Sequence, residues 1–128
     1  MMIDYLERKG FGNLSIKLKR IYEEPVKSDG ARILVDRLWP RGISKEKAKL
    51  DHWLKEIGPT NELRKSFHNG ELSFDKFKEK YLDELQTGEQ LEALEELKRI
   101  AKREKQITLL FAAKDEKENQ AVILKEKL

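Results

Sequence analysis

The sequence predicts an α/β domain whose small, mostly parallel sheet of three to five strands has helices on both faces, in three layers. Two observations favour this class. The runs at residues 31–39 and 107–113 are almost continuously apolar, as in strands covered on both faces. Long segments with helical periodicity separate the strands, and such connections favour parallel pairing. The 128 residues are expected to form one domain, in which residues 1–14 are an N-terminal extension or a short helix.

Two further segments can extend the expected sheet. Residues 15–22 alternate apolar residues, such as Ile16 and Leu18, with lysines, which is typical of a strand with one wet face. Residues 50–58 are short and stop at a Gly-Pro pair. A strand and a helix fit this second stretch almost equally well, so the choice between them stays open.

Helix starts are marked by side chains that can accept hydrogen bonds from the free N–H groups of a first turn. The expected caps are Ser44, Thr60 with Asn61, Ser73, the pair Thr87 and Gln90, and the pair Asp115 and Glu118. The last pair predicts the start of the C-terminal helix. In the long helix after Thr87, Glu95 and Arg99 are expected to pair at i,i+4 spacing.

The composition narrows the class of protein and of chemistry. Charged residues make up 40% of the chain and leave a net charge of +3, so anionic partners are favoured only weakly. The chain has no cysteine, which excludes thiol nucleophiles and Cys-bound zinc and fits a reducing compartment. No apolar run approaches the ~20 residues of a membrane span, and the N-terminus lacks a secretory signal. The expected location is the cytoplasm, without a membrane partner.

The stretch VDRLWPRG, residues 35–42, concentrates charge where a buried strand is expected to end. Alternation places Asp36 on the same face as its neighbouring leucines, where a carboxylate needs a hydrogen bond or a cation. Arg37 then points to the opposite face. The expected partners of Asp36 are therefore Arg41, Lys114 or backbone N–H groups of the following turn.

In open α/β sheets, ligands bind beyond the carboxyl ends of the strands. Three segments that precede helix starts are expected there, residues 36–44, 58–61 and 114–119, and free N–H groups at such starts favour anions. The sequence therefore predicts a site for a small anion, phosphate- or nucleotide-like. The expected ligand-binding residues are Arg37, Trp39, Arg41, Gly42, Ser44 and Lys114. Asp36 and Asp115 are weak candidates for a general base.

Structural roles fit several of these residues as well. Large aromatic residues more often fill a core than bind a ligand, so a core role suits Trp39 better. Asp36 and an arginine also fit a buried pair that fixes the turn. Gly42 fits a turn residue, and Ser44 fits a helix cap alone.

No metal and no cofactor are expected. His52 and His68 stand alone, without a second histidine or a carboxylate at the spacing of metal ligands. The chain has no phosphate-loop, dinucleotide-binding or serine-elbow motif.

The chain closely resembles the YeaO-like branch of a bacterial and archaeal family of unknown function, number 488 among such families. The resemblance is carried by RILVDRLWPRGISKEKAKLDHWLKEIGPTNELRKSF and ITLLFAAKDEKENQAVILKEKL, and VDRLWPRG is its specific part. It covers most of the chain, from about residue 16 to the end. It implies a compact α/β domain but no established reaction. It also implies a shared edge built from Asp36, Arg37, Trp39, Pro40, Arg41, Gly42 and Lys114.

More distant branches of that family differ from this chain at two places. They have a Cys in the last strand and a Cys-His pair just after it, whereas this chain has Phe111 and Asn119-Gln120 at the matching positions. Thiol chemistry in those branches therefore does not extend to this chain.

Three kinds of function stay open. The first is an enzyme or degenerate enzyme acting on a small anion, although no catalytic pair is evident and catalysis is left undecided. The second is a binding module without catalysis, for nucleic acid or protein. The basic residues that would contact phosphates in it are Lys17, Lys19, Arg20, Arg32, Lys45, Lys47 and Lys49. The third is a structural protein, for example a homodimer. Interleaved acidic residues disfavour nucleic acid, so a small anion is the preferred ligand.

Overall fold

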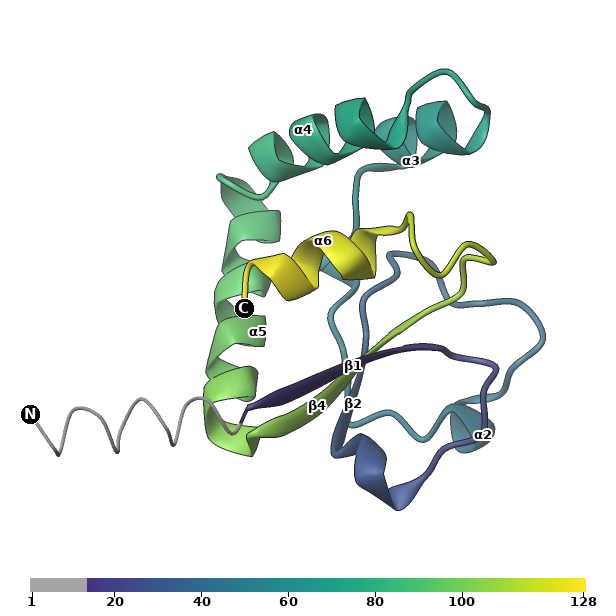
Figure 1. The fold of residues 1–128 in the computed structure, drawn as a ribbon, viewed down its shortest axis with the longest axis vertical. Helices are drawn as coiled ribbons and strands as arrows, with labels where there is room; N and C mark the ends of the chain where they lie inside the picture. The colour runs from purple at the N-terminus through teal and green to yellow at the C-terminus, as the bar shows by residue number, and fades with distance from the viewer. Residues whose placement is uncertain (1–13) are drawn as a thin grey trace, which may run out of the picture.

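The computed structural model describes residues 14–128, in which helices pack against one parallel sheet (Figure 1). The strands are β1 (Ser15–Arg20), β2 (Ala31–Leu34), β3 (His52–Trp53) and β4 (Gln106–Phe111), in the order β1-β4-β2-β3. All three pairs of neighbouring strands are parallel. The expected α/β class with a small parallel sheet is therefore confirmed. The N-terminal extension or short helix expected over residues 1–14 lies, apart from Leu14, outside the described residues.

The segments between the strands and after β4 contain short 3₁₀ turns and helices. They are η1 (Lys27–Asp29), α2 (Lys45–Ala48), η2 (Lys55–Ile57), α3 (Asn61–His68), α4 (Phe74–Glu84), α5 (Gly88–Glu104) and α6 (Gln120–Glu126). In Figure 1, α3 and α4 lie above α6, and α5 runs down one side of the sheet. None of the helices within residues 14–128 is long and apolar enough to cross a membrane.

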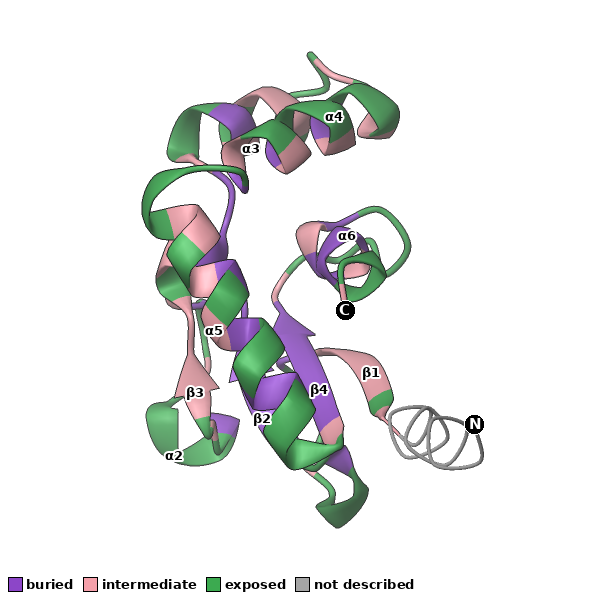
Figure 2. Cartoon of the chain, turned by 90° about the vertical axis from the view of Figure 1, so that its left-hand side faces the viewer, coloured by how far each residue is buried: buried purple, intermediate pink, exposed green. Residues whose placement is uncertain are grey.

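The two faces of the sheet bury unequal apolar layers. Ile33 and Leu109 belong to the larger cluster, which is completed by apolar residues of α3, α4, α5 and α6. Leu34 and Leu110 point the other way, into a smaller cluster with Trp39 and its neighbours around α2. Figure 2 shows β4 buried along almost its whole length between these layers. The fold has the three expected layers, one of them thin.

β2 is shorter than the apolar run at residues 31–39 suggests. The strand ends at Leu34, although the N–H of Val35 still donates to the carbonyl of Leu110 at 3.0 Å. The strict alternation of faces stops there, and Leu38 is 54% exposed. The expectation that Asp36 shares a face with its neighbouring leucines is therefore wrong, because its backbone is no longer part of a strand.

The ambiguous stretch at residues 50–58 contains both kinds of structure. A two-residue strand, β3, pairs with the end of β2, and the 3₁₀ turn η2 follows two residues later. Both alternatives for this stretch are therefore partly right, since its strand is too short to occupy more than its first half.

Three of the expected helix caps are confirmed. Ser44 accepts a hydrogen bond from the N–H of Lys47 and so caps α2. The hydroxyl of Thr60 accepts from the N–H of Leu63 and caps α3. Ser73 caps α4 in the same way. Short hydroxyl side chains placed before an apolar period thus mark these starts correctly.

Two other expected caps differ in detail. Thr87 is the N-cap residue of α5 as expected, but its side chain makes no capping bond, and the side chain of Gln90 donates to Glu84 and to the carbonyl of Gly58. The cap of α6 is Asn119, whose side chain accepts from the N–H of Val122. These helices therefore begin where expected or slightly later, with different partners.

The tertiary contacts of Glu84 and Gln90 help to hold the α3–α4 hairpin against η2. Glu84 accepts both the N–H and the hydroxyl of Thr60, at 3.0 and 2.7 Å. The hydroxyl of the fully buried Tyr81 donates to the carbonyl of Ile57. These bonds fix the start of α3, and the rest of that helix is thereby directed across the end of the sheet.

One carboxylate is fully buried just before β2. Asp29 accepts hydrogen bonds from Arg32 at 2.6 Å, from Lys19 at 3.0 Å and from Lys17 at 3.3 Å. Burial alone would raise the pKa of Asp29. The N–H of Val26 and the three cations outweigh burial and hold the pKa far below its usual value.

Candidate functional site

A cleft opens at the carboxyl ends of β2 and β4, the edge at which the sequence predicts a ligand. Its volume is ≈ 730 Å³, within the range of about 300 to 1,000 Å³ that is typical of small-molecule sites. The loops after β1, β2 and β4 contribute to it, as do α3, α4 and the start of α6. It is lined by Tyr22, Asp36, Arg41, Arg64, Phe67, His68, Phe77, Ala112, Ala113, Lys114, Asp115, Glu118, Asn119 and Gln120.

Asp36 lines this cleft, and its carboxylate accepts hydrogen bonds from two donors. Its carboxylate accepts from the N–H of Ala112 at 3.1 Å and from the side-chain amide of Gln120 at 2.5 Å. The indole N–H of Trp53 donates to its backbone carbonyl at 2.8 Å, which fixes the chain at this point. Of the partners predicted from the sequence, a backbone amide is therefore present. Neither Arg41 nor Lys114 pairs with Asp36.

The surroundings of Asp36 favour its neutral form. Burial is the largest influence and raises the pKa of Asp36 to about 6. The hydrogen bonds from Ala112 and Gln120 act in the opposite direction, as does the positive charge of Arg64 at longer range. Asp36 can therefore exchange a proton close to neutral pH, which few carboxylates do.

Three cations line the same cleft from three different segments. Arg41 comes from the loop after β2, Arg64 from α3 and Lys114 from the loop after β4. None of them forms a salt bridge with another residue of the part of the chain that the structure describes. The Nε atom of Arg64 is shielded from solvent, yet it donates no hydrogen bond within residues 14–128.

Aromatic side chains form another part of the cleft. Phe67 is partly exposed, whereas Phe77 is only 2% exposed, and their rings stack with centroids 4.4 Å apart. His68 follows Phe67 at the end of α3. The sequence suggests no histidine near the strand ends, and it misses Arg64, Phe67 and His68 altogether. These three residues lie at the cleft because of how the α3–α4 hairpin packs, and the local sequence pattern does not indicate that packing.

Arg20, at the end of β1, organises the rim. Its guanidinium donates to the carbonyls of Ala112 and Ala113, at 2.9 Å each, and its charge lies 5.0 Å from the ring centre of Tyr22. The hydroxyl of Tyr22 in turn donates to the backbone carbonyl of Arg41 at 2.6 Å. These contacts tie together the loops that carry Arg41 and Lys114.

Two of the predicted ligand-binding residues serve the structure instead. Arg37 points away from the cleft and donates to the carbonyls of Gly58 and Pro59, at 2.7 and 3.0 Å. Trp39 donates its indole N–H to the carbonyl of Ile43 and packs edge-on against Trp53 in the smaller cluster. The core role that was the alternative for Trp39 is therefore the one observed.

Gly42 and Ser44 also lie outside the cleft lining. Gly42 has φ of 79°, a conformation that favours glycine, and nothing lies within 4 Å of where its Cβ would be. It therefore serves the turn. Ser44 is occupied as the cap of α2.

Asp115 lies at the rim but is a poor candidate for a base. Its carboxylate accepts from the N–H groups of Lys117 and Glu118, at 2.9 Å each, and these bonds lower its pKa. At each of three helix starts, one N–H group donates to the capping side chain, which is Ser44, Thr60 or Asn119. The contribution of these helix starts to anion binding stays a prediction.

The described residues contain no group of three or more histidine, aspartate or glutamate side chains that could hold a metal ion.

Comparison with known proteins places the chain in a family. Residues 15–128 match the model of a protein family described as the inactive DUF488-N3 subclade. The chain belongs to this subclade. The resemblance to the YeaO-like branch of the family is thereby confirmed.

Two relatives align with this chain over much of their own length. The uncharacterised protein YeaO of Escherichia coli (strain K12) is 47% identical over 113 residues, which are 87% of this chain and 94% of YeaO. The uncharacterised protein Rv3073c of Mycobacterium tuberculosis (strain H37Rv) is 38% identical over 82 residues, 64% of this chain and 70% of that protein. No solved structure matches.

In this member of the DUF488-N3 subclade, several residues of the predicted nucleic-acid face are already engaged. Lys17 and Lys19 pair with Asp29, and Arg32 is buried beside the same carboxylate. Arg20 is held by the loop after β4. Phosphate contacts from this face would require these bonds to break.

Proposed function

We propose that the cleft binds a small anion, phosphate- or nucleotide-like, without transforming it. The observation that carries this proposal is the convergence of Arg41, Arg64 and Lys114 on one cleft without a salt bridge within residues 14–128. Asp36, Asp115 and Glu118 line the same cleft, but none of them lies within salt-bridge distance of the three cations. Cations without a bonded carboxylate at a concave surface attract anions. The buried Arg32 is the contrast within the chain, because it is fully paired with Asp29 and backbone carbonyls.

The state of Arg64 adds independent support. A buried donor almost always has a hydrogen-bond partner, and one without a partner in the chain calls for an explanation. The shielded Nε of Arg64 is such a donor among the described residues. A guanidinium offers several donors in a fixed fork that matches the oxygens of phosphate and carboxylate groups, so an anion is a fitting partner.

Binding without chemistry is favoured because no titratable side chain donates a hydrogen bond to Asp36. Asp36 has a suitable pKa of about 6, but it bonds to a backbone N–H and to the amide of Gln120, neither of which can relay a proton. The family description as inactive points in the same direction. The alternative, a nucleic-acid- or protein-binding module, draws less support because four of the seven residues of its basic face, Lys17, Lys19, Arg20 and Arg32, are bonded within the chain.

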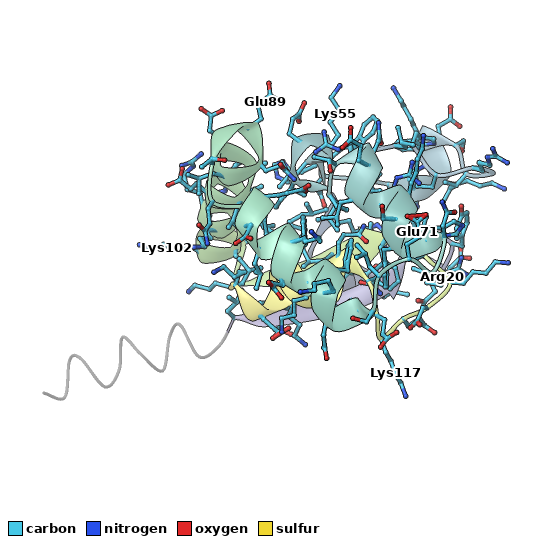
Figure 3. All side chains as sticks on the ribbon, turned by 90° about the horizontal axis from the view of Figure 1, so that it is seen from above. Arg20, Lys55, Glu71, Glu89, Lys102 and Lys117 are labelled. Atoms are coloured by element: carbon cyan, nitrogen blue, oxygen red, sulfur yellow. The ribbon has the colours of Figure 1, made fainter. Side chains whose placement is uncertain are left out.

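The proposal is tested by calorimetric titration of phosphate and sulfate into the protein at low ionic strength. Arg41→Ala and Arg64→Gln are each expected to abolish measurable binding. The melting temperature should change little, because neither side chain makes a salt bridge in residues 14–128. Lys117→Gln is the matched control, since it removes one positive charge from the same region without touching the cleft lining. Figure 3 shows Lys117 pointing away from the body of the molecule.

Three results would contradict the proposal. Wild-type protein that binds neither phosphate nor sulfate would remove the site. Equal losses for Lys117→Gln and Arg64→Gln would show only a diffuse attraction. Unfolding of Arg41→Ala would make Arg41 a structural residue. Tight binding of a single-stranded oligonucleotide, with a steep dependence on salt, would favour the alternative module.

A further inference from the structure

We infer that the anion bound in this cleft carries a planar aromatic ring close to its charged group; this inference rests on the proposed function. The cleft has two chemically different parts. Arg41, Arg64 and Lys114 supply positive charge, whereas the partly exposed Phe67, backed by the buried Phe77, supplies aromatic surface. A bare inorganic anion would use only the first part.

The exposure of Phe67 is the second observation behind the inference. Phe67 stacks on the buried Phe77, with 18° between the ring planes, and Phe77 continues the stack to the fully buried Tyr81. Phe67 is the partly exposed member of this series. Phe67 also contacts the partly buried Phe74, with ring centroids 5.9 Å apart, and it lines a cleft that three cations line as well. Apolar surface exposed at a concave site marks a place where a ligand is buried.

The two parts come close enough to act on one small molecule. Arg64, Phe67 and His68 all lie within five residues on α3, and all of them line the same cleft. Arg64 and Phe67 are three residues apart, which places them on the same side of a helix. An anionic group at Arg64 and a ring at Phe67 are therefore about one helical turn apart, a span that an aromatic phosphate or a mononucleotide covers.

The experiment compares ligands of equal charge on the wild-type protein. Phenyl phosphate is titrated against glycerol 3-phosphate, and adenosine 5′-monophosphate against ribose 5-phosphate, at one pH and one ionic strength. Stacking of a ring on an aromatic side chain is expected to tighten binding of the aromatic member of each pair by at least about fivefold. Adenosine alone should bind much more weakly than its monophosphate, because it lacks the anionic group.

A variant locates the effect in the structure. Phe67→Leu keeps an apolar side chain of similar bulk and removes the ring, so it should lower the affinity for phenyl phosphate toward that for glycerol 3-phosphate. Its affinity for glycerol 3-phosphate should stay within about twofold of the wild-type value, since that ligand has no ring to stack. Saturation-transfer NMR on the wild-type protein gives a second measurement, in which the ring protons of the ligand should receive the strongest transfer.

The outcomes separate this inference from the proposed function. Equal affinities within each pair of phosphates would overturn the aromatic preference and leave the anion site intact. Failure of all four phosphates to bind would overturn the anion site itself. Adenosine binding as tightly as its monophosphate would also overturn the anion site, because charge would then contribute nothing. Weak transfer to the ring protons of a bound ligand would count against the ring contact.

Discussion

Asp29 and Asp36 lie just before and just after β2 and have opposite surroundings, although Asp29 is fully buried and Asp36 partly so. Three cations from the chain itself surround Asp29. Asp36 has only a backbone N–H and an amide as direct donors. The pKa of the first carboxyl is held far below its usual value, and that of the second is raised to about 6.

This difference separates a structural cluster from a candidate site. At the amino end of β2, Lys17, Lys19 and Arg32 each form a salt bridge with Asp29, so these cations are already paired within the chain. At the carboxyl end, Arg41, Arg64 and Lys114 line a cleft without forming a salt bridge in residues 14–128. Cations that form no salt bridge within the described part of the chain are the better indicator of function, although Asp36, Asp115 and Glu118 line the same cleft.

The largest expected effect comes from Asp29→Asn. It leaves Arg32 buried without its counter-charge, since the side chain of Arg32 is only 5% exposed. Removing one partner of a buried pair costs about 3 to 5 kcal/mol of the free energy of unfolding. Urea denaturation of wild type and variant at pH 7 measures this loss in the free energy of unfolding. The control is Lys17→Gln, whose partly exposed pair should contribute less than about 1 kcal/mol. A loss for Asp29→Asn no larger than that of the control would show that the cluster adds little.

The second effect is on the pH dependence of stability, where the two carboxylates act in opposite directions. Asp29 has a depressed pKa in the folded state, so its contribution is present above the pKa of the unfolded chain and is lost as the pH falls below about 4. Asp36 has a raised pKa, so the folded state binds its proton more tightly. Its contribution is greatest below about pH 4 and declines as the pH rises to about 6.

Asp36→Asn should remove that decline. The difference in free energy of unfolding between wild type and variant, followed from pH 4 to pH 7, should change by at most about 3 kcal/mol, with the variant gaining relative to wild type. The variant should fold, because Asn can accept from Ala112 and the amide of Gln120 can turn to accept from it. A loss of about 3 kcal/mol at pH 7 would instead identify Asp36 as the structural partner of a buried cation.

The third effect concerns anion affinity. Protonation of Asp36 removes a negative charge from the cleft, so sulfate should bind at least about threefold more tightly at pH 5.5 than at pH 8. Sulfate is the suitable probe because its own charge is constant over this range. His68 lines the same cleft, so His68→Gln is the control that retains the Asp36 contribution. An unchanged pH dependence in Asp36→Asn would assign the effect to another group.

Local pattern was sufficient for most elements of the fold. The continuous apolar runs gave the buried strands, and Ser44, Thr60 and Ser73 marked helix starts because capping is settled within one turn. One failure involves a tertiary contact, because the side chain of Gln90 bonds to Gly58 and Glu84 and not to its own helix start. The other is local, because Arg99 pairs with Glu96 at i,i+3 spacing instead of with Glu95 at i,i+4.

The candidate site was only half predictable from the sequence. Asp36, Arg41 and Lys114 follow directly from strand ends, which topology brings together. Arg64 and Phe67 reach the cleft only because the α3–α4 hairpin is bonded to η2, a packing fact without a local signature. Arg37 lies outside the cleft lining, and its guanidinium donates to the carbonyls of Gly58 and Pro59, a contact between segments about 20 residues apart.

The smallest expected effect is a change in the pKa of Asp36, the carboxylate at the carboxyl end of β2. Gln120→Leu removes the amide that donates to Asp36 while keeping the space filled. Because that hydrogen bond stabilises the charged form, its loss should move the pKa of Asp36 above about 6. The change is modest, since the N–H of Ala112 still donates to the other carboxylate oxygen. Carboxyl-carbon NMR of the labelled aspartates measures it directly.

Gln120→Ala is the informative companion, because the smaller side chain opens space beside the carboxylate. Water entering there would solvate the charged form and offset the lost donor, so the pKa of Asp36 should rise less than in Gln120→Leu. Lys125→Ala, on an exposed turn of α6, should leave the pKa of Asp36 unchanged. A pKa that falls in Gln120→Leu would mean that the amide does not donate to the charged carboxylate. The contrast between Asp29 and Asp36 would then rest on burial and Ala112 alone.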